Sequence, residues 1–185
     1  ELAYEVNVPA DYGSALADRL LELGDDLGCV PYGLEALDIM RIEKGHVTGA
    51  ELDGRTTATD LGMGGLMSSR KDFIGHALAQ RPGLQDPARP RLVGLKCAQS
   101  DERIHAGSHL LPEGAATALE YDQGWVSSTT YSPTFGHHIA LGFLASGQER
   151  MGERLRAVDL MHGHDVLVDV VSPHFYDPEG TRQRG

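Results

Sequence analysis

The chain opens with alternating apolar and polar residues. Four apolar side chains occupy every second position from residue 2 to residue 8, namely Leu2, Tyr4, Val6 and Val8. A period of two is typical of a strand, because successive side chains of a strand point to opposite faces. Residues 1–8 are therefore predicted to form a strand that is already under way at residue 2, and we expect the chain to be a fragment of a longer protein.

Two amphipathic helices are predicted after this strand. The first carries an apolar stripe at Leu16, Leu20 and Leu23. Asp11 or Ser14 is expected to cap its start, and Gly24 stands where a helix commonly stops. The second is predicted over residues 33–44, where closing basic residues suit the negative end of the helix dipole. A short helix is expected near residues 74–80.

The middle of the chain shows little periodicity. Residues 45–69 are rich in glycine and threonine, and we expect a long excursion with little regular structure. Three prolines then fall within residues 81–90, where neither a helix nor a central strand can continue through them. The domain boundary is placed in this linker, so that residues 1–84 form one lobe and residues 85–185 the second.

Beyond the linker, short apolar segments alternate with turn signals about every dozen residues. Strands are expected at residues 91–97, 108–111, 124–128, 139–144, 154–158 and 165–171. This spacing is typical of a small antiparallel barrel or sandwich. The predicted fold class is α+β, a helix-containing lobe followed by a jelly-roll- or Greek-key-like antiparallel β-barrel. No helix of three or more turns is expected between Arg91 and Val171.

Charge and composition exclude some classes of function. The formal net charge is −11, with 16 Lys and Arg against 27 Asp and Glu. A surface that reads phosphates needs clustered cations, so we expect no nucleic-acid partner. The sequence has no run of 18 apolar residues, and we expect no membrane span. Cys29 and Cys97 lie far apart in the sequence. Two free thiols in a cytoplasmic protein are a simpler interpretation than a disulfide.

Nine histidines raise the question of a metal site. Three residues separate His105 from His109 (H-x₃-H), and one residue separates His162 from His164 (H-x-H). Zinc normally needs three or four converging ligands, and no cysteine or acidic cluster accompanies either pair in sequence. No metal site is therefore predicted. The sequence also contains no phosphate-binding loop, dinucleotide fingerprint or nucleophile elbow.

Acidic and basic residues at two places are candidate ligand-binding groups. Glu1 and Glu5 would share one face of the predicted strand, opposite Tyr4. A carboxylate pairs well with a planar ligand edge that presents two donors, although a solvated strand edge is the simpler alternative. Arg41 and Glu43 are two apart on a helix end and face different sides, so they are either exposed or engaged in an internal ion pair.

Five segments in order resemble the glycine-cleavage T-protein family, whose members are aminomethyltransferases. Residues 1–5 (ELAYE) resemble the end of its "G-E-x-G-Y/F-E" strand, and residues 33–45 resemble its "G-L-x-A-R-D-x-L-R-L-E-A-G" helix. The other similar segments are residues 71–75 (KDFIG), 91–95 (RLVGL) and 124–141, the last of which is similar to the family's "G-x-V-T-S-G-x-x-S-P-T-L-G-x-x-I-A-L". Together these segments cover most of the chain.

The resemblance implies a tetrahydrofolate-binding module. The family's pterin-orienting carboxylate falls on Glu5, whereas its folate-contacting helix arginine falls on Leu37, which cannot make that contact. Arg41 is retained from the motif. The candidate cofactor-binding residues are Glu1, Tyr4, Glu5, Arg41 and Glu43. No catalytic residue is assigned, because the family's catalytic carboxylate lies upstream of the glutamate strand.

Finer features resemble one branch of that family, the α subunits of heterotetrameric sarcosine oxidases. These features are residues 41–46, 80–84 and 173–180. The resemblance implies capture of the imine product of sarcosine oxidation as 5,10-methylenetetrahydrofolate and glycine. It also implies partner β, γ and δ subunits, with FAD, FMN and NAD elsewhere in the complex. Two alternatives stay open: an aminomethyltransferase of glycine cleavage, and a non-catalytic barrel that only holds subunits together.

Overall fold

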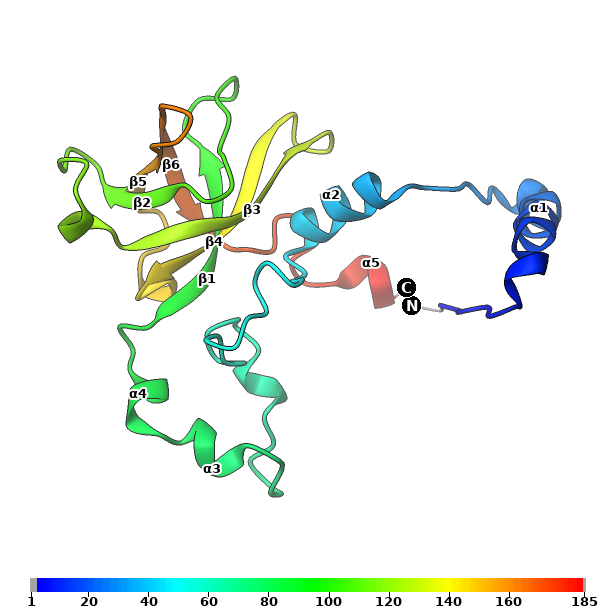
Figure 1. Ribbon diagram of the computed structural model, residues 1–185, viewed down its shortest axis with the longest axis horizontal. Coiled ribbons are helices and arrows are strands. Elements are labelled where there is room, and N and C mark those ends of the chain that lie inside the picture. Colours follow the sequence, from blue (N-terminus) through cyan, green and yellow to red (C-terminus); the bar gives the residue numbers. More distant parts are fainter. Residues whose placement is uncertain (1–2, 185) are drawn as a thin grey trace. The chain divides into compact units, whose positions relative to one another are not determined.

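The computed structural model describes residues 3–184, which divide into two compact units (Figure 1). The larger unit, Ile39–Pro178, contains a β-barrel. The smaller unit consists of the described residues up to Asp38 and from Glu179 onward. Helices precede a closed antiparallel barrel along the chain, so the predicted α+β class is confirmed. The predicted domain boundary near residue 84 stays a prediction.

The opening strand is absent, and that prediction is wrong for residues 3–8. These residues belong to neither strand nor helix, and Tyr4 is 80% exposed. A strand persists only when a neighbour completes its backbone hydrogen bonds. None of the described residues pairs with this segment, so the alternating pattern alone does not produce a strand. Glu1 and Leu2 lie outside the described residues.

The first α-helix, α1 (Gly13–Gly24), ends at the glycine that the sequence indicated. Its start differs from the prediction, since neither Asp11 nor Ser14 caps it through a side chain. A 3₁₀ turn at Ala10–Tyr12 leads directly into the helix, and the Tyr12 N–H donates to Pro9 O across 2.9 Å. This turn places Asp11 before the cap position. A second 3₁₀ turn, Asp25–Leu27, follows α1.

The connection between the second helix and the barrel is irregular, as predicted. Helix α2 spans Leu34–Lys44. Between α2 and residue 75 the only helical element in the described chain is a 3₁₀ turn at Gly64–Leu66. Helix α3 (His76–Ala79) stands where a short helix was expected. The predicted linker contains one further turn of helix, α4 (Pro82–Gln85), which begins on a proline because the first helical position needs no N–H donor.

Six strands form the barrel, and each overlaps a predicted one. They are β1 (Pro90–Cys97), β2 (His109–Pro112), β3 (Gly124–Ser132), β4 (His137–Ala145), β5 (Arg154–Asp159) and β6 (His164–Val171). The closed order is β1-β4-β3-β2-β5-β6, and neighbouring strands pair antiparallel. Strand β1 lies beside β4 after the β2–β3–β4 run, which is the Greek-key arrangement.

No described helix reaches three turns between Arg91 and Val171, as expected. The helical elements there are the 3₁₀ turns Leu119–Tyr121 and Gly147–Glu149. The last helix, α5 (Thr181–Arg184), follows the barrel. Within the described part of the chain, no helix has the length and apolar character needed to span a bilayer.

Two apolar clusters lie on opposite faces of β1 and β4. The barrel interior holds the first cluster, which includes Val93, Leu95 and Leu144. The second cluster packs Ile42 of α2 against Leu92 and neighbouring residues on the outer face. Both faces of β1 are therefore buried, which explains why it is a nearly continuous apolar run rather than an alternating one. Ile42 fixes the end of α2 on the barrel.

Candidate functional site

The end of α2 is joined to strand β3 by a buried polar network. Arg41 Nη1 donates to Glu51 Oε2 across 3.1 Å, and Arg41 Nη2 donates to Ser128 Oγ across 2.8 Å. The Glu51 side chain is fully buried and that of Arg41 is 12% exposed. A buried carboxylate is costly unless a cation and hydrogen-bond donors compensate for lost hydration. Arg41 therefore completes an internal site rather than facing solvent.

A β-bulge brings two consecutive serines to the same carboxylate. Ser127 Oγ and Ser128 Oγ donate to Glu51 Oε1 across 2.7 and 2.6 Å. Consecutive side chains of a regular strand point to opposite faces, so they could not share one acceptor. The register of β3 against β4 shifts between Val126 and Ser128, which changes the direction of these side chains. The bulge is thus part of how Glu51 is held.

The electrostatics of Glu51 favour the ionised form. Burial alone would raise the pKa of Glu51, but hydrogen bonds from Ser128, the Thr48 N–H and Ser127, together with the charge of Arg41, lower the pKa below its ordinary value. Glu51 consequently stays a carboxylate at neutral pH. Its oxygens are all engaged by protein donors, so the group is suited to holding structure in place.

The second acidic residue of α2 points to a different partner. Glu43 is 6% exposed, and its Oε1 accepts a short hydrogen bond from Ser132 Oγ at the end of β3. Ser132 Oγ in turn accepts from the Phe135 N–H across 3.1 Å, which fixes the β3–β4 turn. Arg41 and Glu43 therefore engage two different places on the same strand, β3.

The segment after the barrel returns to the end of α2. The Tyr176 N–H donates to Glu43 O across 2.8 Å, and Lys44 Nζ donates to Asp177 O across 2.5 Å. Gly45 has φ +75°, and a Cβ there would lie 2.4 Å from Pro173 O. Only glycine combines this backbone conformation with this close approach. The helix end is thus held between β3 and the segment at Pro173–Asp177.

A second buried carboxylate anchors the irregular connection. Asp60 is 1% exposed and accepts Arg89 Nη2 across 2.6 Å and the Thr57 N–H across 3.0 Å. Burial would raise the pKa of Asp60, but the hydrogen bonds from Arg89 and Thr57 outweigh that effect and lower the pKa. Asp60 and Arg89 also line a cavity of about 180 Å³ beside Trp125 and Phe143.

That cavity combines an aromatic wall with two arginines. The Trp125 and Phe143 rings are stacked with centroids 5.1 Å apart, and Arg55 lies 6.0 Å from the Trp125 centroid. Such a wall suits a planar ligand. Arg55 is paired with Asp53 and Arg89 with Asp60, so the two positive charges are already compensated within the protein.

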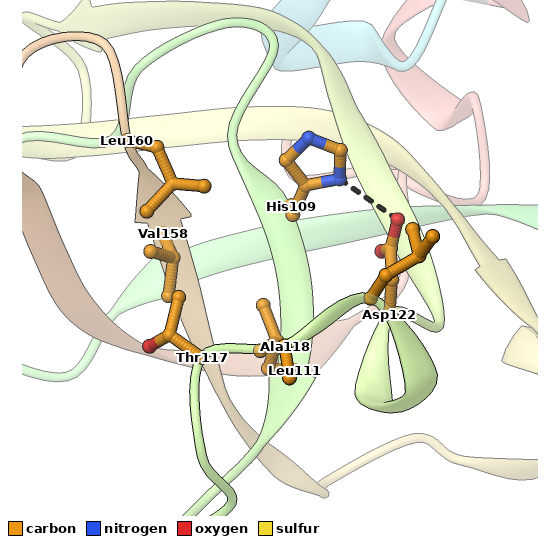
Figure 2. A pocket seen from close by; sticks show the side chains of 8 residues that line it. His109, Leu111, Thr117, Ala118, Asp122, Val158 and Leu160 are labelled. Carbon is orange, nitrogen blue, oxygen red and sulfur yellow. Dashed lines mark hydrogen bonds and ion pairs between the residues drawn. The ribbon is translucent and has the colours of Figure 1, made fainter.

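Figure 2 shows a different, mainly apolar pocket of about 170 Å³. Its polar pair is His109 and Asp122, whose Nδ1 and Oδ2 atoms are 2.8 Å apart. The Thr117 hydroxyl lies on the opposite side of this pocket from the His109 ring (Figure 2). A histidine oriented by a carboxylate can act as a base, but no nucleophile from the drawn residues lies against it. The pocket therefore does not form a nucleophilic triad among the described residues.

The predicted site residues fall into two groups. Tyr4 and Glu5 are exposed in the smaller unit, and Glu1 lies outside the described residues. Arg41 forms an internal ion pair with Glu51 in the larger unit, whereas Glu43 accepts a hydrogen bond from Ser132. The structure does not bring the two groups together within one unit. Contact of any of the five with folate stays a prediction.

Sequence patterns gave no sign of Glu51 or Asp60. Both lie in the glycine- and threonine-rich segment, where neither helical nor strand periodicity assigns a face. Glu51 is separated from Ser128 by 77 residues. The signal that could have drawn attention to them is a threonine three residues before each acid, Thr48 before Glu51 and Thr57 before Asp60, because carboxylates commonly accept hydrogen bonds from nearby backbone N–H groups.

Two sequence profiles from one family match the chain in order. The GCVT N-terminal domain matches residues 1–71, and the glycine cleavage T-protein C-terminal barrel domain matches residues 91–177. The second match coincides with the six-stranded barrel. The chain belongs to the glycine-cleavage T-protein family. In this family context, the network around Arg41 and Glu51 joins residues matched to the first domain with a strand of the barrel domain.

Relatives in the T-protein family include two kinds of named protein. The sarcosine oxidase subunit alpha of Rhizobium meliloti (strain 1021) is 46% identical over 98% of this chain and 18% of its own length. An aminomethyltransferase of Desulfitobacterium hafniense (strain DCB-2) is 31% identical over 97% of this chain and 47% of its own length. The chain thus spans about a fifth to a half of the curated relatives it matches.

A solved structure from the same family has a similar fold. The aminomethyltransferase T of the glycine cleavage system from Bartonella henselae is 25% identical and superimposes with a TM-score of 0.68. The match covers 92% of this chain and 45% of the other chain. The similarity extends beyond the barrel, because the barrel profile accounts for only residues 91–177.

Proposed function

We propose that this chain is part of the tetrahydrofolate-binding module of a sarcosine oxidase α subunit. The observation that carries the proposal is the degree of similarity: 46% identity to the Rhizobium meliloti subunit over nearly the whole chain, against 31% to the Desulfitobacterium aminomethyltransferase. The proposed reaction begins with oxidation of sarcosine to an imine elsewhere in the complex. Tetrahydrofolate bound at this module then accepts the one-carbon unit, giving 5,10-methylenetetrahydrofolate and glycine.

Oxidation of sarcosine is proposed to take place in other parts of the complex. Sarcosine loses two electrons at a flavin, and molecular oxygen takes them to form hydrogen peroxide. FAD, FMN and NAD are proposed to bind outside this chain, and the β, γ and δ subunits are its proposed partners in the cytoplasm. This chain alone should therefore oxidise no sarcosine.

Two sets of residues have different proposed roles. Glu5 is exposed, so its carboxylate can accept two donors from a pterin edge. Tyr4 and Glu1 adjoin it in sequence. Arg41 and Glu43 are proposed to act on folate through position, because their side chains hold α2 against β3. Leu37 stands where the family's folate-contacting arginine is expected.

The alternatives predict different chemistry. An aminomethyltransferase of glycine cleavage would act on a carrier-bound aminomethyl group and would release no peroxide from sarcosine. A scaffold barrel would leave product distribution unaffected by folate. Leu37 in place of the family arginine favours the sarcosine oxidase assignment over glycine cleavage. Among the described residues, no interaction specifically favours the alternative of a barrel that only holds subunits together.

The experiment follows the fate of the one-carbon unit in the intact complex. Purified complex is supplied with methyl-labelled sarcosine, with and without tetrahydrofolate, and peroxide, formaldehyde and labelled methylenetetrahydrofolate are measured. The proposal predicts that folate leaves the initial peroxide rate unchanged and converts labelled formaldehyde into labelled methylenetetrahydrofolate. Absence of peroxide would support glycine cleavage chemistry. Free formaldehyde that is released equally with and without folate, after correction for non-enzymatic condensation, would support the scaffold.

A further inference from the structure

Two histidines contact one carboxylate at the β5–β6 turn, and a third lies against one of them. Asp159 Oδ2 lies 2.6 Å from His162 Nδ1 and 3.1 Å from His105 Nδ1. One ligand-type atom from each of these three residues lies within 4.8 Å of the others. The rings of His164 and His105 lie in a tilted arrangement with centroids 4.1 Å apart. Histidine spacing in the sequence does not indicate Asp159, because His105 lies on the β1–β2 connection, more than 50 residues from the turn.

The carboxylate is held in place by the turn itself. Asp159 is 8% exposed, and its Oδ1 accepts the Met161 and His162 N–H groups across 3.0 and 3.2 Å. These two bonds leave Oδ2 directed at the imidazoles. Metal-binding carboxylates in proteins are commonly oriented in this way, by hydrogen bonds from surrounding groups.

His105 is fixed from the opposite side. The preceding residue, Ile104, is fully buried in the barrel core, and its carbonyl accepts Thr129 Oγ1 across 3.1 Å. His162, by contrast, has a 66% exposed side chain, which gives an ion access to the cluster. One rigid ligand, one oriented carboxylate and one accessible ligand form a site that can close around an ion with little rearrangement.

Hydrogen bonding alone does not explain why so many imidazoles share this place. Neutral imidazoles together with a carboxylate form a donor set that suits zinc and neighbouring transition metals. Tetrahedral bonds of about 2.1 Å would separate ligand atoms by about 3.4 Å. The present Asp159–His105 separation is close to that value, and the exposed His162 would move outward by less than about 1 Å.

We propose that His105, Asp159 and His162 form a binding site for a divalent zinc-class metal ion, with His164 as the nearest further imidazole. Such an ion would tie the β1–β2 connection to the β5–β6 hairpin. The site is independent of the proposed folate chemistry, since none of the five candidate folate residues belongs to it. Arg103 acts electrostatically on His105, and its positive charge would oppose the ion.

The test uses zinc chloride as the probe and the intact protein treated with chelator. Calorimetric titration at neutral pH compares the wild type with His105→Asn, His162→Asn and Asp159→Asn. The control is His76→Asn, because His76 also pairs with a carboxylate, Asp72, at 3.0 Å but lies in no described cluster of three ligands. The wild type and His76→Asn should bind one more zinc equivalent than the three cluster variants, and Arg103→Gln should bind that equivalent more tightly.

Two outcomes would overturn the proposal. Equal stoichiometry and affinity in the wild type and His162→Asn would do so, and this exposed variant should fold even where Asp159→Asn does not. Zinc-edge anomalous diffraction from zinc-soaked wild-type crystals gives a second measurement that requires no variant. It should show a peak within bonding distance of His105 Nδ1 and His162 Nδ1, and absence of density there would overturn the site.

Discussion

Arg41 Nη1 lies 3.1 Å from Glu51 Oε2, and this pair joins the end of α2 to the serines of the β3 bulge. The Glu51 side chain is fully buried, so its charge cannot return to water when Arg41 is removed. Its position makes it the main electrostatic connection between α2 and the barrel strand. The stability of the barrel should therefore respond to Glu51 more than to the exposed carboxylates of the strands.

Glu51→Gln should destabilise the barrel unit by about 3 kcal/mol, because it removes the buried negative charge that accepts hydrogen bonds from Arg41, Ser127 and Ser128. Urea denaturation followed by the fluorescence of Trp125 measures this change, since Trp125 is the single tryptophan of the sequence and lies on β3. Asp169→Asn is the matched control, because Asp169 pairs with Arg154 on the exposed side of the barrel. Equal losses from the two variants would contradict the buried network.

Asp60 should make the stability depend on pH in the acid range. Its pKa is lowered in the folded state from the ordinary value of 3.8, so the unfolded chain takes up the proton first as pH falls. The stabilisation is complete well above pH 3.8 and is lost as pH falls through the lowered pKa. The difference in unfolding free energy between wild type and Asp60→Asn should thus shrink on acidification, as urea denaturation over a pH series would show. A constant difference from pH 6 down to the acid transition would refute this role.

Gly45 should tolerate no side chain. Gly45→Ala adds both the strain of a left-handed backbone, about 1–2 kcal/mol, and a clash with Pro173 O. Gly62→Ala is the matched control, since Gly62 also has φ +75° but nothing lies within 4 Å of its added Cβ. Thermal unfolding should show a distinctly larger loss for Gly45→Ala. If the two variants lost equal stability, the close approach at Pro173 would not constrain the helix end.

The barrel was predictable from sequence because each of its strands has a local sequence signal. Each predicted segment, such as residues 139–144 within β4, combines buried apolar residues with turn signals at both ends. The predicted strand at residues 3–8 is absent for the opposite reason. An alternating pattern allows a segment to form a strand beside a partner strand, but no described residue pairs with this segment. Local pattern predicts an element only where the packing that completes it is present.

The polar sites were less predictable because they join distant residues. Helical spacing indicated that Arg41 and Glu43 face different sides, but it could not name Ser128 and Ser132, two serines of the same strand, as their partners. The three-ligand cluster at Asp159 depends on a loop and a hairpin turn that meet only in the folded barrel. Family resemblance supplied the folate hypothesis for Glu5, which residue spacing alone did not favour.

The proposed pterin contact of Glu5 can be tested by tetrahydrofolate affinity. Glu5→Gln preserves shape but removes the charge and turns one acceptor into a donor that faces donors. A charge-assisted hydrogen bond contributes about 1.5–3 kcal/mol, which corresponds to roughly ten- to a hundredfold in affinity. Glu113→Gln, an exposed glutamate on the barrel between β2 and β3, is the matched control.

Titration of the intact complex with tetrahydrofolate, for wild type, Glu5→Gln and Glu113→Gln, is the most direct measurement of the central claim. The account predicts that Glu5→Gln binds tetrahydrofolate roughly ten- to a hundredfold more weakly, while flavin reduction by sarcosine is unchanged and released formaldehyde rises. The Glu113→Gln complex should bind like the wild type. Equal affinity in all three complexes would contradict the assignment of Glu5 to the pterin, and absence of tetrahydrofolate binding by the wild-type complex would contradict the folate module itself.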